Sequence, residues 1–290
     1  MKIFCLEHNQ IFRDIKKEFE VVNKIEDADR VLLWNDVLPV ERGIVNLARS
    51  LGKKTIVLQH GRKGTSRYYP PFSEPIQADK LLVWGEFDKN SLLEVGQEEK
   101  RIVIVGSPVI SHLKEKKEHK EKNLVFVPEH WDRPVEENQL VRKKLKKLKG
   151  INIVTKIIEV HDPKEFDNPI QSNRSDDNHL DVCADVLSTA DIVVSVYEGT
   201  FELMAQAMDI PVVVMSDWAP KAFNGDIRHT EARRFYSSAC KTTSLKNLIA
   251  TIKHQLKNPD ELKEERKQAA IMEGGYGLNF IENVKKEVIG

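Results

Sequence analysis

The sequence is poor in cysteine and contains no long apolar run. Its three cysteines, Cys5, Cys183 and Cys240, are odd in number and far apart, and no CxxC pair occurs. This usage argues against a disulfide framework and against a zinc knuckle. Cys5 and Cys183 lie in apolar stretches, which predicts that both are buried as small hydrophobic side chains.

The chain also has no excess of charge of either sign. It carries 45 basic and 45 acidic residues in a length of 290. This balance gives no overall attraction to nucleic acid or to an anionic membrane, although a local basic patch is still compatible with it. No stretch approaches the length of a membrane span. The amino terminus reaches charged Glu7 too soon for a signal peptide, so we expect a cytoplasmic protein.

Several motifs for cofactors and metals are missing. No GxGxxG follows the first predicted strand, and there is neither a Walker loop nor an HExxH sequence. Glu118-His119 and Glu129-His130 are adjacent pairs without the spacing of metal ligands. We therefore expect no cofactor and no catalytic metal.

What the sequence does contain is a repeating alternation of short apolar runs and longer amphipathic segments. Continuous runs of β-branched residues suit strands that are buried on both faces of a parallel sheet. Strands that alternate with helices indicate a doubly wound α/β fold. The predicted strands cover residues 2–6, 30–34, 55–58, 80–84, 101–105, 123–127, 151–155, 191–195 and 211–215, and the predicted helices cover residues 10–19, 40–51, 88–95, 135–149, 180–188, 201–208, 244–257 and 277–288.

A run of charged residues interrupts this alternation near the middle of the chain, after which the pattern starts again. This break predicts two domains joined by a solvated linker. The polar stretch 161–179 is expected to be a long loop. The predicted division is an amino-terminal Rossmann-like domain at 1–110, a charged linker at 111–122, a carboxyl-terminal Rossmann-like domain at 123–276 and a closing helix at 277–290 that packs back on the first domain.

Ligands of such sheets bind beyond the carboxyl ends of the strands. With two domains, the expected site is a cleft between them. Glu7 and His8 follow the first predicted strand, where they could face this cleft or belong to a polar turn capped by Asn9. They are therefore candidate catalytic residues.

His60 follows the strand at 55–58 and is the preferred catalytic residue of the first half. Its ordinary pKa lies near neutrality, which suits a general base. Arg62 and Lys63 come next and could meet a phosphate, with glycines that let backbone amides approach a ligand. The alternative is a basic turn on the surface.

Four candidate donor-binding residues follow the first two strands of the second half. Glu129 and His130 precede Trp131, which could stack on a base or sugar or could cover the boundary between the domains. Lys156 and His161 follow the next strand. The alternative for His161 is an ordinary turn that is capped by the Asp-Pro pair after it.

The most informative local pattern is a strand, a tight turn and a helix between Asp191 and Glu202. The turn contains Glu198 and Gly199, and the helix is expected to begin near Thr200. A helix amino terminus presents free N–H groups and a positive dipole end, so it can bind an anion, to which the Thr200 hydroxyl could donate. Thr200 could also be a helix cap alone. Glu202 is a further candidate at this site.

Together these motifs resemble the GT-B superfamily and, within it, the group of CDP-glycerol glycerophosphotransferase, UDP-N-acetylglucosamine 2-epimerase and related glycosyltransferases. A strand that ends in His-Gly, a Trp-Gly to Gly-Ser-Pro segment, a Lys…His-Pro element, a donor-binding strand-turn-helix-strand and a glycine-rich turn before the last helix carry the likeness. These passages are TIVLQHG at 55–61, VWGEFDKNSLLEVGQEEKRIVIVGSP at 83–108, residues 156–163, ADIVVSVYEGTFELMAQAMDIPVVV at 190–214 and GGYGLNFIENVKKEV at 274–288.

The resemblance implies a GT-B-like fold and a metal-independent transferase. Such an enzyme moves a sugar or a polyol phosphate from a nucleotide-activated donor, for which UDP is favoured, to an acceptor hydroxyl. It implies that His60 is the base, that His161 touches the donor phosphate and that Gly199 and Thr200 lie at the diphosphate-binding helix. Proteins of this kind usually carry an acid seven residues before the proline that ends this helix, and Met204 stands there instead.

Three other functions are compatible with the same residues. The chain could be a UDP-sugar 2-epimerase, which needs no acceptor, or a nucleotide-sugar-binding protein without catalysis. It could also be a bacteriophage-type DNA base glucosyltransferase. The acceptor is open among a glycan, a lipid-linked molecule and a DNA base. The basic residues 142–149 could contact a membrane surface or DNA, or could be a solvated helix face.

Overall fold

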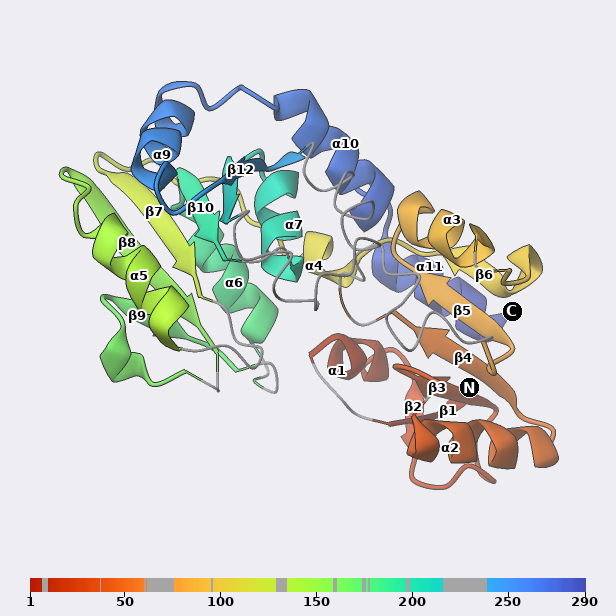
Figure 1. The fold of residues 1–290 in the computed structure, drawn as a ribbon. Coiled ribbons are helices and arrows are strands. Elements are labelled where there is room, and N and C mark those ends of the chain that lie inside the picture. The colour runs from red at the N-terminus through yellow and green to blue at the C-terminus, as the bar shows by residue number, and fades with distance from the viewer. Residues whose placement is uncertain are drawn as a thin grey trace. The chain divides into compact units, whose positions relative to one another are not determined.

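The chain forms two compact units, the first made of residues 1–111 and 271–290 and the second of residues 112–270. Each unit contains one six-stranded sheet with helices around it. The computed structural model (Figure 1) describes residues 1–6, 10–36, 38–59, 61, 76–94, 96–128, 135–158, 161–173, 176, 178–196, 199–215 and 239–290.

The first unit is built on a sheet with the strand order β2-β1-β3-β4-β5-β6, in which every pair of neighbours is parallel. The strands are β1 (Lys2–Cys5), β2 (Glu20–Val22), β3 (Arg30–Leu33), β4 (Lys54–Leu58), β5 (Lys80–Val83) and β6 (Ile102–Ile104), and the helices are α1 (Gln10–Lys16), α2 (Pro39–Ser50), α3 (Glu86–Glu94), α4 (Pro108–Ser111) and α11 (Phe280–Ile289), with a 3₁₀ turn η1 (Glu99–Arg101).

The second unit repeats this plan with the strand order β12-β11-β10-β7-β8-β9, again with parallel neighbours only. Its elements are β7 (Lys122–Val127), α5 (Val135–Leu145), β8 (Ile151–Ile157), η2 (Pro163–Glu165), β9 (Pro169–Gln171), α6 (His179–Ser188), β10 (Ile192–Ser195), α7 (Thr200–Ala207), β11 (Val212–Met215), β12 (Lys241–Thr243) and α9 (Leu248–Lys257). The predicted α/β fold class with two doubly wound units is therefore confirmed.

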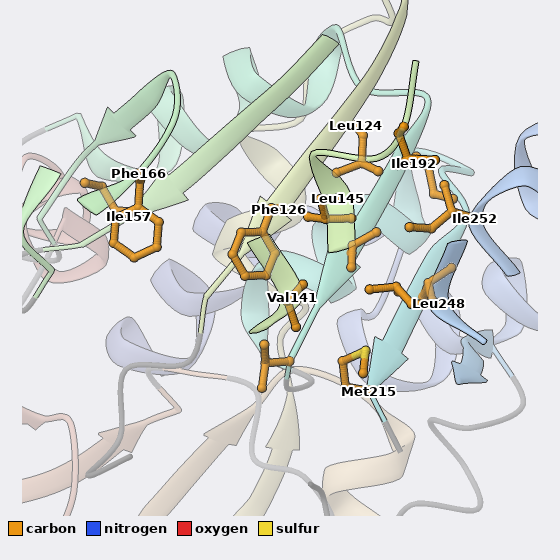
Figure 2. Packing of buried hydrophobic residues seen from close by; sticks show 14 residues of the cluster. Leu124, Phe126, Val141, Leu145, Ile157, Phe166, Ile192, Met215, Leu248 and Ile252 are labelled. Atoms are coloured by element: carbon orange, nitrogen blue, oxygen red, sulfur yellow. The ribbon is translucent and has the colours of Figure 1, made fainter. Parts of the chain in front are cut away.

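The core of the second unit shows why the central strands are continuous apolar runs. Phe126 on β7 packs with Val141 and Leu145 of α5 and with Leu248 and Ile252 of α9, as Figure 2 shows. All five side chains are almost fully buried. Helices pack on both faces of a parallel sheet, so a strand with an alternating polar pattern would bury its polar side chains. The three cysteines are buried and unbridged, as predicted for Cys5 and Cys183.

Several elements differ from the sequence-based expectation. The stretch 161–179, expected to be one long loop, contains η2 and the edge strand β9. Strands β2, β9 and β12 have three residues each, too few to show a period. Helix α10 (Lys263–Gly274) was also missed. Its buried Arg266 donates to Asp209, so a polar side chain stands where an apolar one is usual.

Helix α10 begins in the second unit and ends in the first. The chain beyond it is attached to the first unit by polar contacts from α11. Lys80 on β5 forms an ion pair of 2.8 Å with Glu287, and Asn283 donates to the carbonyl oxygen of Val105 at 3.2 Å. The last residues of the chain therefore complete the unit that the first residues begin.

Three glycine turns pack their backbones against one another in the first unit. Gly85 follows β5, and a Cβ placed there would overlap the carbonyl group of Met272 at the end of α10. Gly275 has a φ of 59°, and a Cβ on it would lie 2.5 Å from the Trp84 carbonyl oxygen and 2.9 Å from the Cα of Gly106. The Trp-Gly, Gly-Ser-Pro and glycine-rich segments thus meet where only a glycine fits.

We expect Gly85→Ala to lower the free energy of unfolding by about 1–3 kcal/mol, because overpacking forces backbone shifts. The matched control is Gly43→Ala on α2, where a Cβ meets nothing within 4 Å. This control should raise stability by roughly 0.5–1 kcal/mol, the usual helix preference for alanine. Denaturant titration of the two variants measures both effects. Equal changes in the free energy of unfolding in the two variants would contradict the close packing at Gly85.

The charged segment that the sequence analysis assigned to a solvated linker is tied to the second unit by ion pairs. Lys114 pairs with Asp185 of α6 at 2.8 Å, and His112 contacts Asp181 of the same helix at 3.0 Å. His119 contacts Asp191, just before β10, at 2.8 Å. Lys114 and both histidines therefore face acids that lie more than sixty positions later in the sequence, and the local sequence does not reveal this pairing.

His119 has an environment that favours its charged form. Its Nε2 lies 2.8 Å from the Asp191 carboxylate and its Nδ1 lies 2.9 Å from the Lys117 carbonyl oxygen. These two acceptors raise the pKa of His119 above its ordinary value. Burial alone would raise the pKa of Asp191, but hydrogen bonds from His119, the Asn123 amide and Lys122 outweigh this and hold it below its ordinary value.

A raised pKa in the folded state means that the charged His119 contributes stability that is present below the unfolded pKa of 6.5 and lost as the pH rises through the folded value. We therefore expect His119→Gln to destabilise the protein most at about pH 5.5 and least at about pH 8.5. Denaturant titrations of both proteins across this range measure the difference. A loss of unfolding free energy in His119→Gln that increases with pH would contradict a stabilising charged form of His119.

Candidate functional site

Three of the predicted donor-binding residues, His161, Gly199 and Thr200, follow strands of the second sheet. Strands β7, β8 and β10 are parallel neighbours, with Ser195 opposite Val127 and Phe126 opposite Thr155, so their carboxyl ends lie at the same edge. His161 follows β8, and Gly199 and Thr200 follow β10. Glu129, His130, Trp131 and Glu198 also follow these strands in the sequence but lie outside the described residues.

Helix α7 begins at Thr200, as the sequence predicts, with Gly199 as its N-cap residue. The Gly199 N–H donates to the Oε2 of Glu202 at 2.6 Å, and this glutamate is 2% exposed. Glu202 therefore closes the start of its own helix, as the last acid of a capping box does. Thr200 and Phe201 form the first turn of α7, directly after its N-cap residue.

Met204, the residue at the position where the resemblance expects a ribose-binding acid, is 1% exposed. It lies on the buried side of α7, which packs on β10 and β11. A thioether in the core cannot contact a ribose. One carboxylate oxygen of Glu202 caps the helix, and the role of this residue in donor binding stays a prediction.

Lys156 lies on β8 with its ammonium group inside the unit. It is 4% exposed, and its Nζ donates to the carbonyl oxygens of Ile157 at 2.9 Å and of Ser172 at 3.5 Å. Cys183 of α6 is nearby, where burial raises the pKa of its thiol although the charge of Lys156 works against this. The thiol is therefore neutral. That Lys156 binds a donor phosphate stays a prediction.

A polar group around Lys156 was not found from the sequence. The Ser172 hydroxyl lies 3.0 Å from the Nδ1 of His179, and the Nε2 of His179 lies 3.8 Å from the Sγ of Cys183. His179 and Cys183 are one helical turn apart on α6, a spacing that could have indicated their proximity. Ser172 follows the short strand β9, which gave no signal in the sequence.

His161 stands at the turn between β8 and η2. Its Nδ1 accepts a hydrogen bond from the Ile158 N–H at 3.3 Å, and its ring packs edge-on against Phe166 with 5.6 Å between the centroids. A neutral ring with this acceptor carries its proton on Nε2 and can donate it to a phosphate oxygen. Asp162 accepts from the Lys164 N–H at 3.0 Å, so the alternative of a capped turn is also present in the structure.

In the first unit, the candidates Glu7, His8, His60, Arg62 and Lys63 lie outside the described residues. The backbone next to His60 is nevertheless well held. Gln59 accepts from the Trp84 N–H at 2.9 Å and donates to the Gly61 carbonyl oxygen and to Asp88, each at 3.0 Å. The Trp84 indole donates to the Gln59 carbonyl oxygen at 2.9 Å. Sequence analysis missed this network because it joins three separate segments.

Among the described residues, no group of three or more His, Cys, Asp and Glu side chains is arranged to hold a metal ion. Within the same part of the chain, no helix has both the length and the apolar character needed to cross a bilayer. The cleft expected between the two domains stays a prediction.

Comparison with known proteins identifies the fold. No protein-family model matches the chain, and no curated protein sequence matches it. A candidate UDP-N-acetylglucosamine 2-epimerase from Listeria monocytogenes has a TM-score of 0.60 at 15% identity, covering 99% of this chain and 86% of that one. The wall teichoic acid polymerase TagF with CDPG has a TM-score of 0.61 at 12% identity, covering 99% and 87%.

A third solved structure, Anabaena Alr3699/HepE in complex with UDP and glucose, has a TM-score of 0.57 at 8% identity and covers 99% of this chain and 97% of that chain. The three similar proteins thus cover almost the whole chain, in both units. Their two-domain architecture is that of the GT-B fold. At these identities the likeness establishes the fold alone, and on that ground the chain has a GT-B-like α/β fold.

Proposed function

We propose that the protein transfers a sugar or a polyol phosphate from a nucleotide-activated donor, UDP-linked by preference, to an acceptor hydroxyl. The observation that carries this proposal is the amino terminus of α7, which begins directly after β10 at the carboxyl edge of a parallel sheet. A helix start at this place is a ready site for a diphosphate. The fold shared with proteins solved with CDPG or with UDP and glucose supports it.

In this proposal the second unit holds the donor. The first-turn amides of α7 and the Thr200 hydroxyl donate to the diphosphate, and the Nε2 proton of His161 donates to another phosphate oxygen. Arg62 and Lys63 offset the remaining negative charge. Such preorganised donors act most strongly on the leaving diphosphate, where negative charge develops during the reaction.

In sugar transfer the acceptor hydroxyl oxygen attacks the donor carbon and the nucleoside diphosphate leaves. In polyol phosphate transfer it attacks the phosphorus that bears the polyol, the P–O–P bond breaks and the nucleoside monophosphate leaves. His60 takes the hydroxyl proton as general base. The hydrogen bonds of Gln59 and Gly61 on either side of His60 support this role, because a base must be held in place to act. No metal is needed, since protein donors and cations stabilise the leaving group. Glu7 and His8 remain secondary candidates for the same step.

Epimerisation is a second candidate, favoured by the match to the Listeria protein over almost its whole length. An epimerase would consume a UDP-sugar without an acceptor. A third candidate, binding without turnover, is favoured by two observations at α7. Met204 is buried where related proteins carry a ribose-binding acid, and the Glu202 carboxylate already occupies part of the helix start.

A thermal-shift panel with UDP, CDP, GDP, ADP and their sugar or polyol conjugates tests the donor site. A ligand that binds only the native state at 100 times its Kd stabilises it by about 2.7 kcal/mol. We expect the UDP compounds to raise Tm and Thr200→Val to weaken their binding roughly 5–30-fold, because one hydroxyl donor to a charged phosphate is lost. Thr242→Val, an exposed threonine on β12, is the matched control.

Turnover then separates the three functions. Release of UDP that depends on an added acceptor, together with loss of this activity and intact UDP binding in His60→Gln, supports transfer. Conversion of the UDP-sugar without an acceptor supports epimerisation. No thermal shift with any nucleotide at millimolar concentration would contradict the donor site in all three forms.

A further inference from the structure

Two neighbouring stretches of the second unit carry basic residues and no acid. They are residues 138–150, which contain most of α5, and residues 244–259, which contain α9. Both helices contribute to the same hydrophobic core cluster and contact each other. Their outward sides are therefore parts of one surface.

Most of the lysines in these two stretches are exposed, and Lys144 is half-buried. On α5, Val141 and Leu145 are buried, whereas Lys143 lies half a turn away from Val141 and Lys147 follows the end of the helix. The same geometry holds on α9. Leu248 and Ile252 are buried there, and Lys253 and Lys257 lie on the opposite side. We call the whole set the lysine face, which consists of Lys143, Lys144, Lys147, Lys149, Lys246, Lys253 and Lys257.

None of the seven lysines of this face forms an ion pair with a described side chain. By contrast, Arg142 and Lys146 on the edge of α5 both pair with Asp167, at 3.4 and 3.2 Å. The nearby acid Glu261 is used by Lys241 and His254, at 2.7 and 2.8 Å. Asp167 and Glu261 are therefore occupied by side chains outside the face, and no described side chain of the unit forms an ion pair with the lysines of the face.

We propose that the lysine face binds the surface of a lipid bilayer that carries anionic headgroups. Clusters of 4–8 lysines or arginines on a helix surface are attracted to such a surface over roughly a Debye length, about 10 Å at 0.1 M salt. Because this attraction is short-ranged, the zero net charge of the whole chain does not oppose it. The proposal does not depend on the transfer reaction.

The chemistry of the face favours a bilayer over nucleic acid. The cations of these two stretches that form no ion pair with a described acid are all lysines, which act as point charges, whereas their one arginine, Arg142, is held by Asp167 rather than left for bidentate contact with a phosphate or a guanine. Leu140, 44% exposed, stands among Lys143, Lys144 and Lys147. An exposed aliphatic side chain can enter the headgroup region of a bilayer but has no polar group with which to contact a nucleic-acid backbone.

Co-sedimentation of the full chain with vesicles tests the proposal. We expect binding to vesicles with about 30% phosphatidylglycerol and none to pure phosphatidylcholine vesicles, with loss of binding when NaCl is raised from about 0.1 to 0.5 M. The variant Lys143→Gln/Lys147→Gln/Lys253→Gln/Lys257→Gln should lower the partition coefficient roughly 100-fold or more, since each lysine near an anionic surface contributes to binding. These side chains are exposed, so the variant should keep the Tm of the parent protein.

The matched control removes the same charge elsewhere. Lys24, Lys120, Lys267 and Lys286 are also exposed lysines without an ion pair to a described side chain, and their joint replacement by glutamine should leave vesicle binding unchanged. Equal loss in both variants, or equal binding to both kinds of vesicle, would overturn the proposal. Binding to a duplex DNA in fluorescence anisotropy at the same salt, without binding to vesicles, would overturn it in favour of nucleic acid.

Discussion

Parallel pairing of the strands is the constraint on which the rest of this molecule depends. Every strand pair that the structure describes, in both sheets, is parallel. Each connection must then cross back along the sheet, helices cover its faces, and the central strands are buried. Few polar side chains lie on such strands, so we expect the chemistry at the edge where the strands end.

The same constraint explains what the sequence could predict. Long runs of β-branched residues predict the central strands. A turn in which a glycine precedes a hydroxyl residue predicts the start of α7 at Thr200. Strands β2, β9 and β12 could not be predicted, because a strand of three residues is too short to show a pattern of hydrophobic residues. Helix α10 could not be predicted from a hydrophobic pattern, because its largest buried side chain is the polar Arg266. The Arg266 guanidinium donates to Asp209 and to carbonyl oxygens.

The part of the site that could not be predicted consists of contacts between distant segments. Gln59 holds the neighbours of His60 through Trp84 and Asp88, which follow it by more than twenty positions. Lys156 looks like a phosphate ligand in the sequence, yet its ammonium group lies inside the unit on two carbonyl oxygens. Strand ends can be located from hydrophobic patterns, but the direction of a side chain at a strand end depends on its tertiary partners.

The amino terminus of α7 has a mixed electrostatic character. The positive end of the helix dipole favours an anion there. The buried Glu202 carboxylate accepts from the Gly199 amide and brings negative charge to the same place. In the proposed reaction, the hydrogen bonds that Thr200 and His161 give to a donor diphosphate must therefore outweigh this repulsion. This balance decides between a working donor site and binding without turnover.

Hydrogen–deuterium exchange with and without UDP tests the central claim, that the carboxyl edge of the second sheet holds the nucleotide diphosphate. The amides of Thr200 and Phe201 and those of the turn at 161–163 should exchange more slowly when UDP is bound. The amides of α2, which belongs to the first unit, should not change. Binding of UDP without protection of the first turn of α7, or with protection confined to other elements, would contradict the account.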